Sequence, residues 1–198
     1  DIGRLASLNV FAHDTMNFYP DILMTRADYV TSVSKAVDML PDITDKRYNR
    51  NTRSRRNKDK EVSPFDDLKT NSIYYPTIKN AYDKGFINGL SPRRFGPDEY
   101  IDRAQAVTLL VRAAGLEGLA PNYGYTTQYA DDSRIPLWAK DSIYVASKMG
   151  IIQGDSRGRI NPGDSLTRAE AAALVNRYID YLKKDFQKDY KDGIINYK

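Results

Sequence analysis

The sequence predicts an all-α fold, a pseudo-threefold bundle of three helix-loop-helix repeats with short extended segments in the loops. Three observations support it: the chain repeats itself, each copy has apolar residues at helical spacing, and each copy carries helix start and stop signals. Two helices of about 12 residues bury too little surface to be stable alone. We therefore expect the copies to pack against one another.

Two offsets describe the repetition. An offset of 65 carries residues 81–89 onto 146–154, Arg103 onto Arg168, and the pair Asp66-Asp67 onto Asp131-Asp132. A backward offset of 77 relates the second copy to a first copy that lacks its beginning. The predicted organisation is repeat 1 at 1–40, a basic insertion at 41–62, repeat 2 at 63–118, a linker at 119–127, repeat 3 at 128–180 and a tail at 181–198.

The first helix of each complete copy ends at a glycine. In the third copy Pro136 suits a first helical turn, and Gly150 is placed to cap the C-terminus. Pro76 and Gly85 repeat the design in the second copy. The apolar stripe of the third copy, which we expect to face the core, is Trp138, Ile143, Ala146 and Met149.

The second helix of each copy begins with a capping pattern. Thr25, Asp102 and Thr167 are each followed by Arg-Ala, and then by a residue that can bond back to the cap. Gln105 and Glu170 are long enough to do so, whereas Asp28 is too short. The tail is predicted to continue the last helix through Tyr190, with Gly193 ending it.

Composition excludes several classes of function. The chain has 198 residues, a net charge of +4, one His and no Cys, so disulfides, thiol catalysis and multi-His metal sites are excluded. His13 has no nucleophile motif beside it and is read as a polar loop residue. Without an apolar run of roughly 18 residues, we expect no membrane insertion. The absence of a leader and the abrupt start predict a mature or excised fragment.

The positive charge is concentrated in one segment. Residues 45–61 hold eight Lys and Arg against three acids, and the remainder is nearly neutral. This segment is read as a solvated loop, with contact to anionic wall polymers as the alternative, and we expect no nucleic acid partner.

Several motifs resemble the S-layer homology domain family. They are Phe65-Asp66-Asp67, Gly85-Phe86-Ile87-Asn88-Gly89, Phe95-Gly96-Pro97 and Arg103-Ala104-Gln105, then Tyr129-Ala130-Asp131-Asp132, Gly150-Ile151-Ile152-Gln153-Gly154, Ile160-Asn161-Pro162 and Thr167-Arg168-Ala169-Glu170. In the first copy only Val10-Phe11, Phe18-Tyr19-Pro20 and Thr25-Arg26-Ala27-Asp28 remain. The resemblance covers most of residues 2–180.

The resemblance implies a secreted, non-catalytic module at a bacterial cell surface, part of the wall or S-layer. Its expected partner is an acidic, pyruvylated secondary cell-wall polysaccharide, bound in grooves between the repeats without a cofactor or metal. The chain is expected to be a monomer with an internal pseudo-trimeric arrangement. A tether that binds peptidoglycan or a protein is the main alternative, and a glycan-active enzyme is a weaker one.

Arg26, Arg103 and Arg168 are the main site candidates, because a cation at the first helical position opposes the helix dipole and calls for an anion. Either an internal partner such as Asp131 or Asp164 supplies it, or a ligand carboxylate binds to the guanidinium together with free helix N–H groups. The resemblance implies the second for the Thr-Arg-Ala-Glu motif.

The remaining candidates each have a structural alternative. Gly85, Gly89, Gly150 and Gly154 either take positive φ or let a sugar approach the backbone. Trp138 is read as core, with stacking on a sugar as the alternative. Asp66 and Asp131, each beside a second Asp, are read as caps or partners of Arg near the ligand, because adjacent acids are poorly placed to flank a glycosidic bond.

Overall fold

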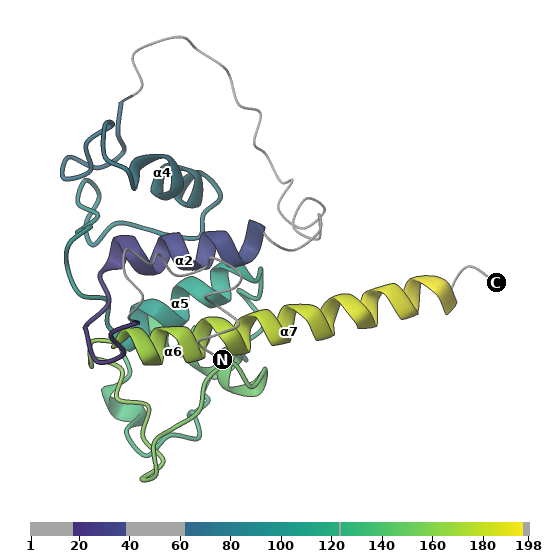
Figure 1. The fold of residues 1–198 in the computed structure, drawn as a ribbon. Coiled ribbons are helices and arrows are strands. Elements are labelled where there is room, and N and C mark those ends of the chain that lie inside the picture. The colour runs from purple at the N-terminus through teal and green to yellow at the C-terminus, as the bar shows by residue number, and fades with distance from the viewer. Residues whose placement is uncertain (1–17, 39–61, 123, 196–198) are drawn as a thin grey trace.

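The structure is a computed structural model that describes residues 18–38, 62–122 and 124–195, the last eleven of these by backbone only. The predicted basic segment 45–61 and His13 lie outside the described residues. The helices are α2 (Arg26–Asp38), α4 (Tyr75–Asp83), α5 (Arg103–Ala113), α6 (Leu137–Lys148) and α7 (Arg168–Ile195), with a 3-10 turn η1 (Asp132–Arg134) (Figure 1). Strand pairing in these residues is limited to four isolated bridges. The all-α prediction is confirmed.

The helices that begin at the motif arginines form the centre of the molecule. α2, α5 and α7 all contact one another, while α4 packs on α2 and α6 packs on α5. Each of these two outer helices therefore covers a central helix that precedes it in the chain. The buried side chains of the central helices include Val30, Val107, Leu110 and Val175. An isolated helix pair would leave this apolar surface exposed to water.

A closed ring of main-chain hydrogen bonds lies at the centre. The amide of Met24 donates to the carbonyl of Leu166 at 2.8 Å, Leu166 donates to Ile101 at 3.0 Å, and Ile101 donates back to Met24 at 3.0 Å. These residues are related by the offsets of 77 and 65, and all three are buried. The ring joins residues 18–38 to both later copies through equivalent main-chain hydrogen bonds.

The first turns of the central helices add further main-chain hydrogen bonds between the copies. The amide of Ala27 donates to Pro97 O at 3.0 Å, Ala104 donates to Pro162 O at 2.9 Å, and Ala169 donates to Pro20 O at 3.0 Å. The amides of the preceding arginines likewise donate to carbonyls of another copy: Arg26 to Glu99, Arg103 to Asp164 and Arg168 to Ile22. Each copy is thus bonded to the next, and the last to the first.

The last helix is longer than the sequence predicts. α7 continues through Gly193 to Ile195 and leaves the body of the molecule (Figure 1), so the prediction that Gly193 ends it is wrong. A helical glycine costs only about 1 kcal/mol relative to alanine, which reduces helix stability without fixing an end. In the described part of the chain, no helix combines the length and the apolar composition needed to cross a membrane.

Candidate functional site

Two surface grooves lie at equivalent places around the axis. Groove 1 has a volume of about 230 Å³ and groove 2 of about 320 Å³. Each combines the arginine of one copy with the glycine loop and second helix of the next. The corresponding lining residues are Arg26 and Arg103, Ile87 and Ile152, Asn88 and Gln153, Ile101 and Leu166, Gln105 and Glu170, Leu109 and Leu174, and Arg112 and Arg177.

Arg26 lies at the base of groove 1 and is 7% exposed. Its Nε donates to Phe95 O at 2.9 Å, its Nη1 donates to Gln105 Oε1 at 2.7 Å, and its guanidinium lies 5.0 Å from the centre of the Phe95 ring. Burial lowers the pKa of Arg26, although Asp102, Glu99 and Asp67 oppose the shift. The side chain stays a cation, as arginine does in proteins, and it is positioned by neutral partners.

Arg103 occupies the equivalent position in groove 2 but contacts a carboxylate. Its Nη2 lies 2.5 Å from Glu170 Oε1, and its Nη1 donates to Ile160 O at 3.5 Å. Burial raises the pKa of Glu170, but the hydrogen bond from Thr167 and the charge of Arg103 outweigh it, so the net shift is downward. The internal ion pair that we considered from sequence is therefore present here, although its partner is Glu170, not Asp131 or Asp164.

Arg168, like Arg26 and Arg103, donates to a loop carbonyl of another copy. Its Nε donates to Phe18 O at 3.0 Å, and its guanidinium lies 5.2 Å from the centre of the Phe18 ring. Phe18, Phe95 and Ile160 are equivalent under the two offsets. All three motif arginines therefore begin a central helix and bond to the corresponding loop carbonyl of another copy.

The expectation of free helix N–H groups beside these arginines is wrong. The first two amides of each central helix donate to carbonyls of another copy, as described above. The next amide, that of Asp28, Gln105 or Glu170, donates to the capping side chain of Thr25, Asp102 or Thr167. An anion in these grooves would thus meet side chains, not a row of unpaired amides.

Trp138 is not a core residue. It is 57% exposed and lines groove 1 from α6, while Ile143 and Ala146 of the same predicted stripe are buried and Met149 is 36% exposed. The buried face of α6 begins in its first turn and contains Ala139, Ser142, Ile143 and Ala146, so Trp138 lies one residue away from the start of that face. An exposed indole in a groove offers a flat apolar face.

The four glycines fall into two pairs. Gly85 and Gly150 have φ of +76° and +72° and follow helix ends, as predicted. Gly89 and Gly154 lack positive φ. A Cβ on Gly89 would lie 2.3 Å from Ser91 O and 2.8 Å from Phe65 Cε1, and one on Gly154 would lie 3.2 Å from the Tyr129 ring. Their small size is needed for packing, and only Gly154 of the four lines a described groove.

The acidic pairs hold loops in place, and the offset of 65 aligns them wrongly. Asp67 accepts from the amides of Phe95 and Gly96, while Asp131 accepts from Ile160 and Asn161, the equivalent residues. Asp67 therefore corresponds to Asp131, with an offset of 64. Asp66 is exposed and pairs with Arg93, and neither Asp66 nor Asp131 lines a described groove.

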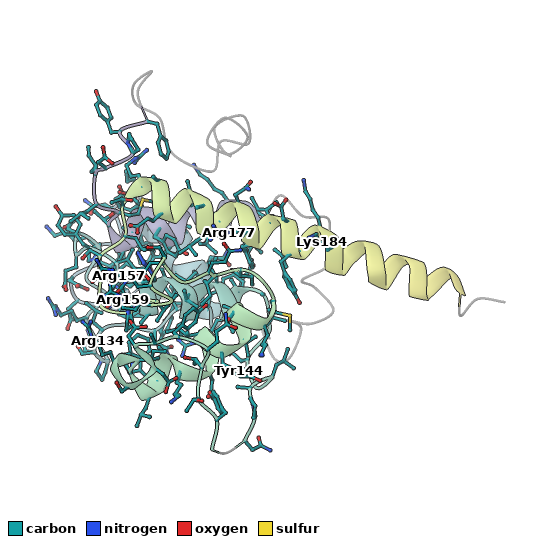
Figure 2. All side chains as sticks on the ribbon, turned by 90° about the horizontal axis from the view of Figure 1, so that it is seen from below. Arg134, Tyr144, Arg157, Arg159, Arg177 and Lys184 are labelled. Atoms are coloured by element: carbon teal, nitrogen blue, oxygen red, sulfur yellow. The ribbon has the colours of Figure 1, made fainter. Side chains whose placement is uncertain are left out.

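Sequence reasoning missed the second arginine of each groove. Arg112 and Arg177 follow Gln105 and Glu170 by seven residues, two helical turns, so they lie on the same helix face. Asn88 Oδ1 accepts from Arg112 Nη1 at 3.1 Å in the orientation that satisfies both ends of its amide. Figure 2 shows Arg177 on α7, with Arg159 in the loop before that helix, and both line groove 2. The seven-residue spacing was the available signal.

Comparison with known proteins identifies two segments. Residues 64–107 and 128–172 match the model of the S-layer homology domain. Among the described residues, no cluster of His, Cys, Asp or Glu has the composition of a metal site.

Relatives with this type of sequence include surface proteins and enzymes. The chain is 31% identical to an endoglucanase of Bacillus sp. (strain KSM-635) over 66% of its own length and 14% of the relative's. It is 31% identical to a surface-layer 125 kDa protein of Lysinibacillus sphaericus over 59% and 10%. It is 29% identical to an amylopullulanase of Thermoanaerobacterium thermosulfurigenes over 88% and 8%.

The chain spans only 8% to 14% of the length of these three relatives, so the similarity concerns one part of much longer proteins. That part is shared by a surface-layer protein and by enzymes with different names, as expected of a module that occurs in otherwise different proteins. Together with the equivalent grooves, the family match identifies residues 64–107 and 128–172 as two S-layer homology repeats.

Proposed function

We propose that the chain anchors a protein non-covalently to the bacterial wall by binding an acidic, pyruvylated secondary cell-wall polysaccharide. Groove 1 carries the proposal: it is lined by Arg26 and Arg112, and its described lining residues include no carboxylate. Arg112 pairs through Nε with Glu117, which lies outside the lining, at 3.0 Å. A ketal carboxylate would pair with these guanidinium groups, and a sugar ring would stack on Trp138. A cell-surface location follows from the S-layer homology segments and the surface-layer relatives.

We also propose that residues 18–38 belong to a third repeat of the same kind. The main-chain ring through Met24 and the bond from Arg168 to Phe18 support this, because both repeat contacts made by the two matched segments. The whole chain would then present three successive arginines around one axis. Several grooves would increase avidity for a polymer that carries repeated acidic groups.

A glycan-active enzyme receives less support from the acidic residues. Asp67 and Asp131 accept main-chain hydrogen bonds, Asp66 pairs with Arg93, and Asp132 pairs with Lys140. Hydrolysis needs a pair of carboxyl groups free to act on the two sides of a scissile bond, and these four are engaged as hydrogen-bond acceptors or ion-pair partners.

Calorimetric titration with a pyruvylated N-acetylmannosamine glycan, beside the same glycan without pyruvate, tests the proposal. We expect binding that requires pyruvate and falls at least tenfold in Arg112→Ala, since a charge-assisted bond is lost. Arg93→Ala, which removes the same charge outside the grooves, is the matched control and should bind normally. Retained wall binding without affinity for either glycan would contradict the proposal and favour peptidoglycan or a protein as partner.

A further inference from the structure

We infer that the surface between residues 125–128 and α6 is a second glycan site, which binds one uncharged sugar ring and does not require pyruvate. A hollow of about 150 Å³, here named the α6 hollow, lies at this surface and shares no lining residue with groove 1 or groove 2. It is lined by Thr126, Thr127, Gln128, Tyr144, Ser147 and Lys148. The inference goes beyond the proposed function, because it concerns a different surface and a different part of a glycan.

The two walls of the α6 hollow are held together by the fold. The hydroxyl of Tyr125 donates to Asp141 on α6, and its ring centre lies 4.8 Å from that of Tyr144, with an angle of 61° between the ring planes. The amide of Thr127 donates to Asp132 Oδ1 at 2.7 Å. Because these contacts fix both walls before a ligand binds, little ordering is needed on binding.

Polar side chains of the α6 hollow are available to a ligand. Within the described part of the chain, the side chains of Thr126, Gln128 and Ser147 make no hydrogen bond. Hydroxyl and amide groups both donate and accept, as the hydroxyls of a sugar do. The described lining contains no acid, and the carboxylate of Asp132 in the adjoining turn η1 is paired with Lys140 at 2.8 Å. This combination favours a polar, uncharged ligand.

Tyr144 adds an aromatic ring to these polar groups. The residue is half-buried, and the Nζ of Lys148 lies 5.5 Å from the centre of its ring. Since Lys148 is exposed, its ammonium group can exchange this contact for a ligand hydroxyl. The ring then offers an apolar surface to the C–H groups of a sugar. A volume of about 150 Å³ is below the roughly 300–1,000 Å³ of pockets for drug-sized ligands, which suits a single ring.

The second copy lacks this arrangement. An offset of 65 relates Tyr144, Ser147 and Lys148 to Lys79, Tyr82 and Asp83 on α4. There Lys79 pairs with Asp83, and the Tyr82 ring packs edge-on against Phe65 with centres 5.1 Å apart. Internal contacts thus occupy these positions of α4, so the inferred site belongs to the third copy.

Amide chemical shifts, which report binding too weak for calorimetric titration, test the inference when the N-acetylmannosamine glycan without pyruvate is added to the whole chain. We expect the shifts of residues 126–128 and 144–148 to move, with a dissociation constant in the millimolar range, as for one small ring. Tyr144→Leu should weaken this binding at least fivefold, because the stacking surface is lost. The double change Thr126→Ala and Gln128→Ala should weaken it about two- to tenfold, because two hydrogen-bonding groups are lost.

Tyr100→Leu, which removes an exposed tyrosine outside the α6 hollow and both grooves, is the matched control and should bind normally. Matching helical circular dichroism establishes that each variant is folded. Unmoved shifts at 126–128 and 144–148, or equal binding by a folded Tyr144→Leu, would overturn the inference. Absence of pyruvate-dependent binding in the grooves, with the shifts at the α6 hollow retained, would overturn the proposed function alone.

Discussion

At the scale of single residues, Leu137 and Trp138 make a natural comparison. They are neighbours at the start of α6, with exposed fractions of 88% and 57%, but only Trp138 lines groove 1. An exposed apolar side chain contributes little to folding, so a role for Trp138 should be visible in binding and nearly absent in stability.

We therefore expect Trp138→Ala to lower affinity for the pyruvylated glycan about five- to thirtyfold, the value of one lost stacking contact of roughly 1–2 kcal/mol. The free energy of unfolding should change by no more than about 0.5 kcal/mol. Leu137→Ala is the control and should alter neither quantity. Titration calorimetry and urea unfolding measure the two effects, and a large loss of stability in Trp138→Ala would contradict the assignment.

The two kinds of glycine should also respond differently to substitution. Gly89→Ala places a Cβ within 3 Å of two carbonyl oxygens and an aromatic carbon, so the loop must shift and we expect a loss of about 2–4 kcal/mol. Gly85→Ala has open space around it and meets only the cost of positive φ, about 1 kcal/mol. Equal losses in chemical unfolding would show that packing does not distinguish these positions.

At the scale of helices, the three capping sequences give three different outcomes. Only Thr167 and Glu170 form the reciprocal arrangement, with both the amide and the hydroxyl of Thr167 donating to Glu170. Gln105 instead accepts from Arg26, and Asp28 accepts from Thr25 and from the hydroxyl of Tyr74. The same sequence pattern therefore forms different hydrogen bonds, depending on which residues lie beside it in the fold.

Removing the cap of α7 should cost about 1 kcal/mol in Thr167→Ala, because one helix amide and the hydroxyl contact to Glu170 are lost. Thr167→Ser, which keeps the hydroxyl, should retain most of the stability. Thermal unfolding of both variants checks this expectation, and equal melting temperatures for Ala and Ser would contradict it.

These helices also show how far sequence reasoning reaches. Caps, prolines and glycines are local signals, so the starts at Arg26, Arg103 and Arg168 and the stop at Gly150 could be predicted. The contact between Arg103 and Glu170 joins residues 67 positions apart and depends on how the copies pack. Trp138 was misjudged because it lies five residues before Ile143, whereas the face that is buried starts at Ala139.

At the scale of the whole molecule, acidic side chains make stability depend on pH. Arg93 lowers the pKa of Asp66, Lys140 lowers that of Asp132, and the amide of Arg159 with other donors lowers that of Asp155 well below its usual range. Burial raises the pKa of Asp102, which partly opposes the effect. A carboxyl group whose pKa is lowered in the folded protein stabilises the folded state at pH values above its ordinary pKa. This stabilisation is lost as the pH falls.

We expect the free energy of unfolding to be nearly constant from about pH 5 to 8 and to decrease below about pH 4, where these carboxylates begin to bind protons. Asp155→Asn should be less stable at neutral pH and should lose less stability on acidification than the unmodified chain. Urea unfolding at pH 3 and pH 6 measures both. A parallel decrease in the two proteins would mean that Asp155 does not contribute.

The ring formed by Met24, Leu166 and Ile101 also affects how the molecule unfolds. An open stack of repeats has two ends, and either end can fray while the rest stays folded. A circle has no end, so releasing any one copy removes an acceptor from one neighbour and a donor from the other. A pull applied to one copy would therefore be resisted by all three, a property that suits the proposed anchoring role.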